Sequence, residues 1–500
     1  MQRYRDWVRT SLATTVASLS LSNAVPIAQA GEIHPRAPGT PQPTIEGAAP
    51  ASPYAVLRQD EDWSFDLPNR PLKWIALDSG GVVRLDLAGD AFLKGKWYRN
   101  QSFGDVTDVE DNANTRLNLH AGLTIAERVR LYIALKHGGI HGSKVPASPV
   151  ADEPIDLHQS FAEVRLGDAF GLQPNDVLVR LGRQELHYGA GRLISIREGP
   201  NVRNDFDGAL VRARLGGIVS DAFYFEPSLD GPDAFDNAFA NGDGFGNGDS
   251  VWGLYGSGYL GSLGPATFEA DAFYVGFGRA DSPYVTATFS EVRHTIGVRL
   301  WSMNANGPKL EIEGGYQFGT ASSLGSNPNE ALDVSAYYLA GQVGWRFAEI
   351  ALSPTVGVDY GISSGDHDPK DGTLGTFRAP YPPGRYFGET NPLGPGNLTG
   401  ARLFVDIEPL DGMTLTAQVQ AFWRLSPSDG VYSPPGTVLR GPAGSERFVG
   451  YEPGIVLNWA VDDHWNVFAR AARFVSGPFL DDNKPGKDIT NFELNLSYRF

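Results

Sequence analysis

Arginine and lysine recur at every second position in several segments of the chain, opposite rows of apolar side chains. Arg128 and Arg130 form one such pair, and Arg212 and Arg214 form another. Side chains two residues apart point to the same face of a β-strand. A ring of arginines along a water-filled passage attracts anions, because guanidinium stays charged and pairs with carboxylates through two hydrogen bonds. The basic positions on these faces are Arg116, Arg128, Arg130, Lys136, Arg165, Arg180, Arg212, Arg214, Arg293, Arg299 and Arg470.

Acidic side chains share these faces and favour a second interpretation. Their carboxylates would pair with the arginines, so the passage would be lined by charges that neutralise one another rather than by a basic ring. The sequence leaves both interpretations open. The acidic positions are Asp86, Asp90, Glu163, Glu269, Asp271, Glu291, Glu311, Glu313 and Glu493.

One polar segment offers clustered oxygen ligands of the kind that bind Ca²⁺. Asp366, Asp368 and Asp371 follow one another closely and precede a glycine. Lys370 interrupts the spacing that calcium-binding loops use, so a solvated turn is the alternative. We predict no other cofactor.

Recognisable catalytic motifs are absent from the sequence. It contains no nucleophile elbow, Walker loop or HExxH pattern. His158 and Ser160 are close enough in sequence to suggest a hydrolytic pair, but the sequence places no third residue beside them. We therefore predict that the chain is not an enzyme.

The elements that must position these side chains are strands with one apolar and one polar face. In 83–97, apolar residues at every second position alternate with Arg, Asp and Lys, and the same alternation recurs in 116–125 and 413–424. Such segments are typical of strands that cross a membrane between lipid and water. Their number is about 18, an even count as in single-chain bacterial barrels. We therefore predict an all-β fold, a transmembrane antiparallel β-barrel over 54–500.

Short and long connections alternate along the chain, as expected when one end of each hairpin faces the periplasm and the other faces outside. Short turns are predicted at 126–127, 216–217, 261–265, 348–349, 411–412 and 462–463. Long polar connections are predicted at 99–114, 138–154, 227–249, 363–398, 426–445 and 476–487. The last segment alternates from Phe492 to Phe500 and ends on an aromatic residue, like the terminal strand of outer-membrane barrels.

Composition and the N-terminus are consistent with an envelope protein. The 500 residues include no cysteine and carry a formal net charge of -17. A chain this acidic lacks the basic surface that nucleic-acid binding requires. A positively charged start precedes an apolar stretch and an A-x-A cleavage signal at 28–30. We predict a signal peptide over 1–30 and a Pro-rich periplasmic leader over 31–53.

Two segments carry a resemblance to a known family. RLGRQELHYGAGRLISIREGPNVRNDFDG occupies 180–208, and GDHDPKDGTLGTFRAPYPPGRYFGETNPLGPGNL occupies 365–398. Both resemble signature stretches of the alginate export proteins, and LRQDEDWSF at 57–65 fits the same pattern. The resemblance covers nearly all of the chain after Tyr54. It implies a large outer-membrane barrel that exports an anionic substrate, with an acidic polysaccharide such as alginate as the first candidate.

The resemblance also implies roles for residues in the first of these segments. The residues that would narrow the pore and meet an anion are Arg183, Gln184, Arg192, Arg197 and Arg203. The alternative is that the arginines attach a folded-in loop to the wall through nearby acids. The acids available for that role are Glu185, Glu198, Asp205 and Asp207.

The expected location is the outer membrane of a Gram-negative-type bacterium. Outer-membrane lipid and lipopolysaccharide would surround the barrel, and an anionic polysaccharide or a small anion would pass through it. Periplasmic secretion proteins are candidate partners at its inner end, and nucleic acid is not expected as a partner. A diffusion pore for small nutrients or anions is the alternative function, because the same barrel would serve it.

Overall fold

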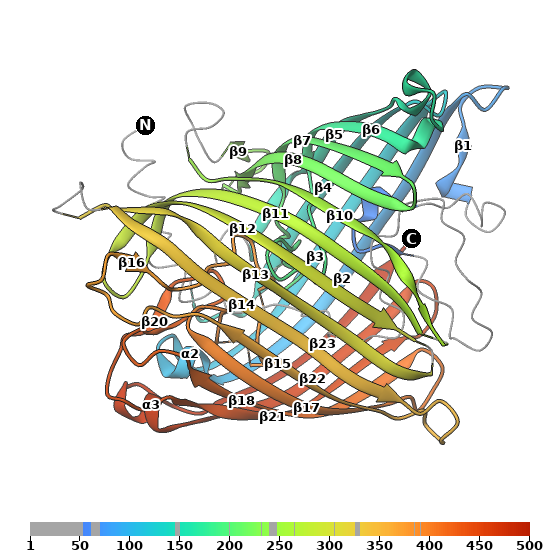
Figure 1. The fold of residues 1–500 in the computed structure, drawn as a ribbon. Helices are drawn as coiled ribbons and strands as arrows, with labels where there is room; N and C mark the ends of the chain where they lie inside the picture. Colours follow the sequence, from blue (N-terminus) through green and yellow to red (C-terminus); the bar gives the residue numbers. More distant parts are fainter. Residues whose placement is uncertain are drawn as a thin grey trace.

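Each long strand of the chain pairs antiparallel with the next, and the last strand pairs with the first. In this computed structural model, β23 (Ile489–Arg499) pairs with β2 (Val83–Asn100) from Asp90 opposite Arg499 to Arg99 opposite Thr490. The pairing closes the sheet, so the fold is an 18-stranded antiparallel β-barrel, as predicted (Figure 1). A closed barrel satisfies every backbone hydrogen-bonding group within the wall, as spanning a membrane requires.

The structure describes residues 54–61, 71–145, 151–199, 201–231, 233–239, 248–264, 266–304, 306–325, 331–384, 386–390 and 392–500. The other wall strands are β3 (Thr107–Ile125), β4 (Val129–His141), β5 (Glu153–Arg165), β6 (Val177–Gln184), β7 (Phe206–Leu215), β8 (Ile218–Leu229), β10 (Ser250–Leu263), β11 (Ala266–Pro283), β12 (Thr288–Met303), β13 (Gly307–Ser323), β14 (Ala331–Arg346), β15 (Thr355–Ser363), β17 (Leu398–Ile407), β18 (Met413–Arg424), β21 (Phe448–Ala460) and β22 (Trp465–Ser476).

Short elements lie at the two ends of the barrel. At one end Figure 1 shows α2 (Gln101–Gly104), α3 (Pro478–Asp482), β16 (Thr373–Leu374) and β20 (Val438–Arg440), and at the other end it shows β1 (Ile75–Ala76). The remaining short strands are β9 (Ala238–Phe239) and β19 (Val431–Tyr432). No helix in the described residues is long and apolar enough to cross a membrane.

The wall has an apolar outer face and a polar inner face. On β4, Leu131 and Ile133 are exposed, whereas Ala134 and Lys136 point inward and are buried. The exposed apolar side chains would be unfavourable in water but face lipid here. The alternation predicted from the sequence is therefore the register of the barrel wall.

The connections follow the predicted alternation with one clear error. The turn at 216–217 joins β7 to β8 directly, and the long connection predicted at 363–398 is confirmed between β15 and β17. The long connection predicted at 99–114 is wrong, because β2 continues to Asn100 and β3 starts at Thr107. These strand ends carry polar side chains on both faces, so they lack the apolar alternation by which strands were recognised. The predicted signal peptide and leader lie outside the described residues.

Two neighbouring residues of β18 provide a test of the register. Val419 is exposed on the outer face, and Gln420 is buried on the inner face. Val419→Arg should destabilise the folded barrel by about 2 to 4 kcal/mol, because the charge would face hydrocarbon near the middle of the strand. The matched control, Gln420→Arg, should cost much less. Urea unfolding in lipid vesicles measures both, and equal losses of stability would contradict this register.

Candidate functional site in the barrel lumen

Two long loops enter the lumen and pair with each other. The β6–β7 loop (185–205) and the β15–β17 loop (364–397) meet where Ile194 forms a parallel β-bridge with Tyr381. The Ser195 N–H donates to the Tyr381 carbonyl at 2.8 Å, and the Tyr381 N–H donates to the Leu193 carbonyl at 2.9 Å. Apolar residues favour this position of the loops inside the barrel. Leu193 and Ile194 are buried in a cluster with inward-facing aromatic side chains of the wall. The two loops therefore narrow the passage together.

Arg192 attaches the β6–β7 loop to a wall strand that is not adjacent to β6 or β7. Its guanidinium lies 2.6 Å from Glu311 and 2.8 Å from Glu313, both on β13. Arg299 on β12 shares these carboxylates, at 3.3 Å from Glu311. Burial by itself would lower the pKa of Arg192, but Glu311 and Glu313 outweigh burial and raise it well above its usual value. Arg192 is therefore a charged attachment point rather than a free ligand for an anion.

Glu198 forms a second attachment, which links the β6–β7 loop to β3. Its carboxylate pairs with Arg116 on β3, and it also pairs with Arg203 within the loop. Burial would raise the pKa of Glu198, but the two arginines outweigh burial and lower that pKa to about 2. Arg203 also reaches Glu185 at 3.3 Å, and Arg183 holds Asp207 at 2.8 Å. These contacts support the interpretation in which the arginines attach a folded-in loop to the wall.

The β15–β17 loop is attached by its own set of contacts. Arg378 donates to the Tyr284 hydroxyl at 2.8 Å and lies 3.4 Å from Glu291 on β12. Arg293, also on β12, donates to the carbonyl of Thr376 at 2.8 Å. On β21, Glu452 accepts the backbone N–H of Thr390 at 2.9 Å. Both ends of the loop are therefore held inside the barrel.

An N-terminal segment, residues 54–61, also lies against the lumen wall. Asp60 pairs with Arg180 on β6 at 2.7 Å and with Arg212 on β7 at 3.3 Å. The side chain of Gln59 donates to the Glu185 carbonyl at 3.0 Å, and Arg58 lies 3.7 Å from Asp90. The sequence assigned this segment to the barrel domain without giving it a role. Its dense run of charged residues, RQDED, was the available signal, but the sequence does not indicate which residues they contact.

Most of the predicted pore-lining arginines are paired with carboxylates, and buried basic and acidic side chains are nearly equal in number. The lumen is therefore largely neutralised, as the second interpretation of the sequence predicted. The arginines in ion pairs are Arg116, Arg128, Arg130, Arg165, Arg180, Arg183, Arg192, Arg203, Arg212, Arg293 and Arg299.

Three predicted positions differ from this pattern. Arg128 belongs to the turn between β3 and β4, where its side chain is 57% exposed beside Asp168, so its prediction as a lumen residue is wrong. Arg214 lies near the same end of the barrel and donates to the Asn175 carbonyl at 2.6 Å. Arg197 makes no ion pair with any described residue, and its buried Nε has no hydrogen-bond partner among them.

Two lysines on β2 resemble Arg197 in this respect. Lys94 and Lys96 are buried on the inner face, and neither forms an ion pair within the described residues. The Lys94 ammonium donates to the Gly199 carbonyl at 2.9 Å, which places it beside the β6–β7 loop. Lys96 faces Glu493 across the sheet, but Glu493 is held by Arg470 at 2.6 Å. The sequence places both lysines on the wet face, although nothing in it distinguishes them from paired residues.

The predicted calcium residues do not converge. Asp368 and Asp371 are exposed and accept backbone N–H groups of their own turn, from Lys370 and Thr373. Asp366 is buried, and its backbone N–H donates to Asp429. Burial and the nearby charge of Asp429 raise the pKa of Asp366 to about 6. The geometry favours the solvated turn over a calcium site at these residues, because two of the three carboxylates accept backbone N–H groups of their own turn.

The residues that suggested a hydrolase are also separated. His158 points inward, where its ring nitrogens lie 2.9 Å from Asp205 and 2.8 Å from Glu185. Ser160 is on the exposed outer face of β5. A β-bulge lies next to them in the strand, and the two side chains do not form a catalytic pair.

A closed barrel with an apolar exterior, a charged interior and two loops that narrow its lumen is an outer-membrane pore. Its fold is that of transport porins rather than of enzymes. The chain belongs to the alginate export family, whose sequence model, described as "Alginate export", matches residues 83–491. No curated protein sequence matches the chain significantly.

Solved outer-membrane channels share the fold. OccK3 (OpdO) of Pseudomonas aeruginosa aligns with a TM-score of 0.51 and 16% identity, over 83% of this chain and 96% of that one. P. aeruginosa OpdK, solved with vanillate, aligns with a TM-score of 0.54 and 13% identity, over 83% and 98%. OccAB2 of Acinetobacter baumannii gives 0.54 and 12%, over 83% and 98%. At this identity the likeness establishes the architecture alone.

Proposed function

We propose that this pore carries an anionic substrate across the outer membrane, and that an acidic polysaccharide is the first candidate. The observation that carries the proposal is a group of three basic side chains, Lys94, Lys96 and Arg197, that form no ion pair with any described residue, whereas most of the predicted pore-lining arginines do. Membership of the alginate export family supports the same substrate class.

The three side chains belong to β2 and to the β6–β7 loop, which contact each other. Lys94 contacts the β6–β7 loop at Gly199, two residues after Arg197, and Lys96 follows Lys94 on the same face of β2. A row of fixed positive charges beside a narrow passage lowers the energy of an anion there, since walls of low dielectric constant focus the field. A chain of uronate units presents carboxylates at regular intervals, which several basic groups in a row would suit.

A small carboxylate is the second candidate. The likeness to OpdK, a channel solved with vanillate, favours it, because the same three basic groups would bind one carboxylate as well as several. The two candidates differ in how many carboxylates they present. A polymer would place several carboxylates near the three basic side chains at once, whereas a small anion would place only one there.

We infer transport without catalysis, since the candidate pair His158 and Ser160 points to opposite faces of the wall. The exposed leucines and isoleucines of the outer face suit outer-membrane lipid, with lipopolysaccharide in the outer leaflet. Periplasmic secretion proteins would meet the end of the barrel that carries the short turns.

The triple variant Lys94→Gln, Lys96→Gln and Arg197→Ser tests the proposal. Wild-type channels in a planar bilayer should give a reversal potential, across a salt gradient, that indicates a preference for anions. The triple variant should lose this preference. The change should be greatest in dilute salt, because screening shortens to about 8 Å at physiological ionic strength.

The control for this variant is Arg473→Ser, which removes one positive charge from an exposed ion pair with Asp488 and should leave the reversal potential unchanged. An anion preference that persists in the triple variant, with the barrel folded, would contradict the proposal.

A further inference from the structure

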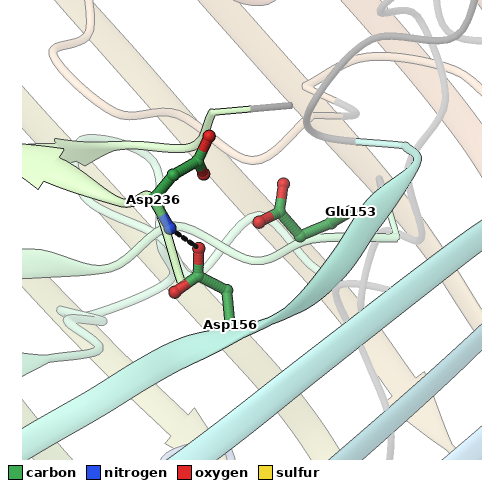
Figure 2. A group of neighbouring side chains, drawn as sticks. All are labelled: Glu153, Asp156 and Asp236. Atoms are coloured by element: carbon green, nitrogen blue, oxygen red, sulfur yellow. Dashed lines mark hydrogen bonds between the residues drawn. The ribbon is translucent and has the colours of Figure 1, made fainter. Parts of the chain in front are cut away.

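Three acidic side chains converge near the outer end of the barrel. Glu153 and Asp156 belong to β5, and Asp236 lies just before β9, in the connection that follows β8. One carboxylate oxygen from each lies within 4.8 Å of the others. Figure 2 shows the three carboxylates turned toward one another from two different segments.

Glu153 indicates that this cluster has a ligand. It is 0% exposed, and neither of its carboxylate oxygens has a hydrogen-bond partner among the described residues. One oxygen of Asp236 is also buried without a partner. A buried carboxylate with no partner is strongly unfavourable, and three neighbouring carboxylates repel one another when all are ionised. A bound cation would remove both costs.

The backbone fixes two of the three carboxylates in place. Asp156 accepts the N–H groups of Asp236 and Asn237, each at 3.2 Å, and Asp236 accepts the N–H of Asp233 at 2.9 Å. A Cβ atom at Gly231 would come within 2.1 Å of the Asp236 carboxylate, so a larger residue there would displace that carboxylate from its present position. The loop is therefore built around these oxygens.

We propose that Glu153, Asp156 and Asp236 bind a calcium ion. Carboxylate oxygens are ligands for hard cations, and Ca²⁺ accepts them at about 2.3 to 2.6 Å in flexible geometry. Two oxygens on one Ca²⁺ can therefore be up to about 5 Å apart, which the cluster satisfies. Mg²⁺ requires a tighter octahedron and gives up its water reluctantly. Water would supply the remaining ligands.

Among the described residues, no basic side chain forms an ion pair with Glu153, Asp156 or Asp236. Lys136 is the base whose charge acts on Glu153, but its ammonium pairs with Asp205 at 3.1 Å and also with Asp230. The ion would join the start of β5 to the β8–β10 connection, where the Phe235 N–H already donates to the Ile155 carbonyl. Calcium from the external medium would thus hold two outer connections together.

The test uses the purified full chain in detergent, freed of metal with EDTA and then titrated with CaCl₂ or MgCl₂ by calorimetry. We expect one Ca²⁺ site per chain with weaker Mg²⁺ binding. Glu153→Gln and Asp236→Asn should each weaken Ca²⁺ binding by roughly ten-fold or more, given that outer-shell substitutions alone cost about that much. Asp366→Asn, in the other acidic segment, is the control and should bind like wild type.

Thermal unfolding gives a second readout, because the difference in unfolding temperature between Glu153→Gln and wild type should change sign between EDTA and CaCl₂. In EDTA, Glu153→Gln should unfold at a higher temperature than wild type, because it relieves repulsion among the carboxylates. In CaCl₂ the order should reverse. Absence of Ca²⁺ binding by the folded wild-type chain, or equally tight binding by Glu153→Gln and Asp236→Asn, would overturn the proposal. Wild-type stability that is the same in EDTA and in CaCl₂ would point to a shared proton instead and would also overturn it.

Discussion

Replacing Arg58, Gln59 and Asp60 together with alanine is expected to raise single-channel conductance several-fold. These residues hold the N-terminal segment, residues 54–61, against the lumen wall through Asp90, Glu185, Arg180 and Arg212. Without those contacts the segment should leave the lumen and widen the path for ions. The substitutions remove one positive and one negative charge, so a rise in conductance would reflect an opened lumen rather than a change of net charge.

The matched control removes a similar pair of charges outside the lumen. Lys484 and Asp481 form an exposed ion pair in the β22–β23 connection, and replacing both with alanine should leave conductance unchanged. The anion preference of the N-terminal variant should also increase, because Arg180 and Arg212 lose one of their two carboxylate partners. Wild-type conductance in a variant that still folds would show that the segment does not obstruct the pore.

Arg192→Ala is the second variant with a large expected effect. It leaves the buried carboxylates of Glu311 and Glu313 with Arg299 as their basic partner, besides the Tyr338 hydroxyl that donates to Glu313, and it frees the β6–β7 loop from β13. Breaking a buried ion pair by removing one partner typically costs about 3 to 5 kcal/mol. The free energy of unfolding in urea should fall by that amount, and current recordings should become noisier as the loop moves.

Two comparisons make this result specific. Arg192→Lys keeps the positive charge and should recover part of the stability, although an ammonium is more strongly hydrated than a guanidinium and therefore costs more to bury. Arg473→Ala removes an exposed arginine that pairs with Asp488 and should change stability little. If Arg192→Ala unfolds like wild type, the attachment of the loop depends on its apolar contacts instead.

The wall of the barrel could be predicted from the sequence because lipid and water impose a period of two. Leu131 and Ile133 face outward as their spacing indicates, and the turn at Gly216 and Gly217 falls where predicted. The ends of β2 and β3 could not be predicted, since strands that extend beyond the membrane carry polar side chains on both faces.

The interior could be predicted only in part, because its contacts join residues far apart in the chain. The family resemblance implied that Arg192 belongs to a loop that narrows the pore, but its partners Glu311 and Glu313 are on a wall strand more than a hundred residues later. Spacing likewise does not separate the unpaired Lys94 and Arg197 from paired neighbours such as Arg116. Whether a charged side chain in the lumen forms an ion pair depends on how the loops fold, and a local sequence pattern does not show this.

Block of the single-channel current by an acidic oligosaccharide tests the central claim most directly. The purified chain in a planar bilayer should give discrete current steps, and a short oligouronate should interrupt them at concentrations where a neutral oligosaccharide of equal length does not. The Lys94→Gln, Lys96→Gln and Arg197→Ser variant should conduct without being blocked. Absence of current steps from the folded barrel, or equal block by the neutral and the acidic oligosaccharide, would contradict an anion-selective pore for an acidic polysaccharide.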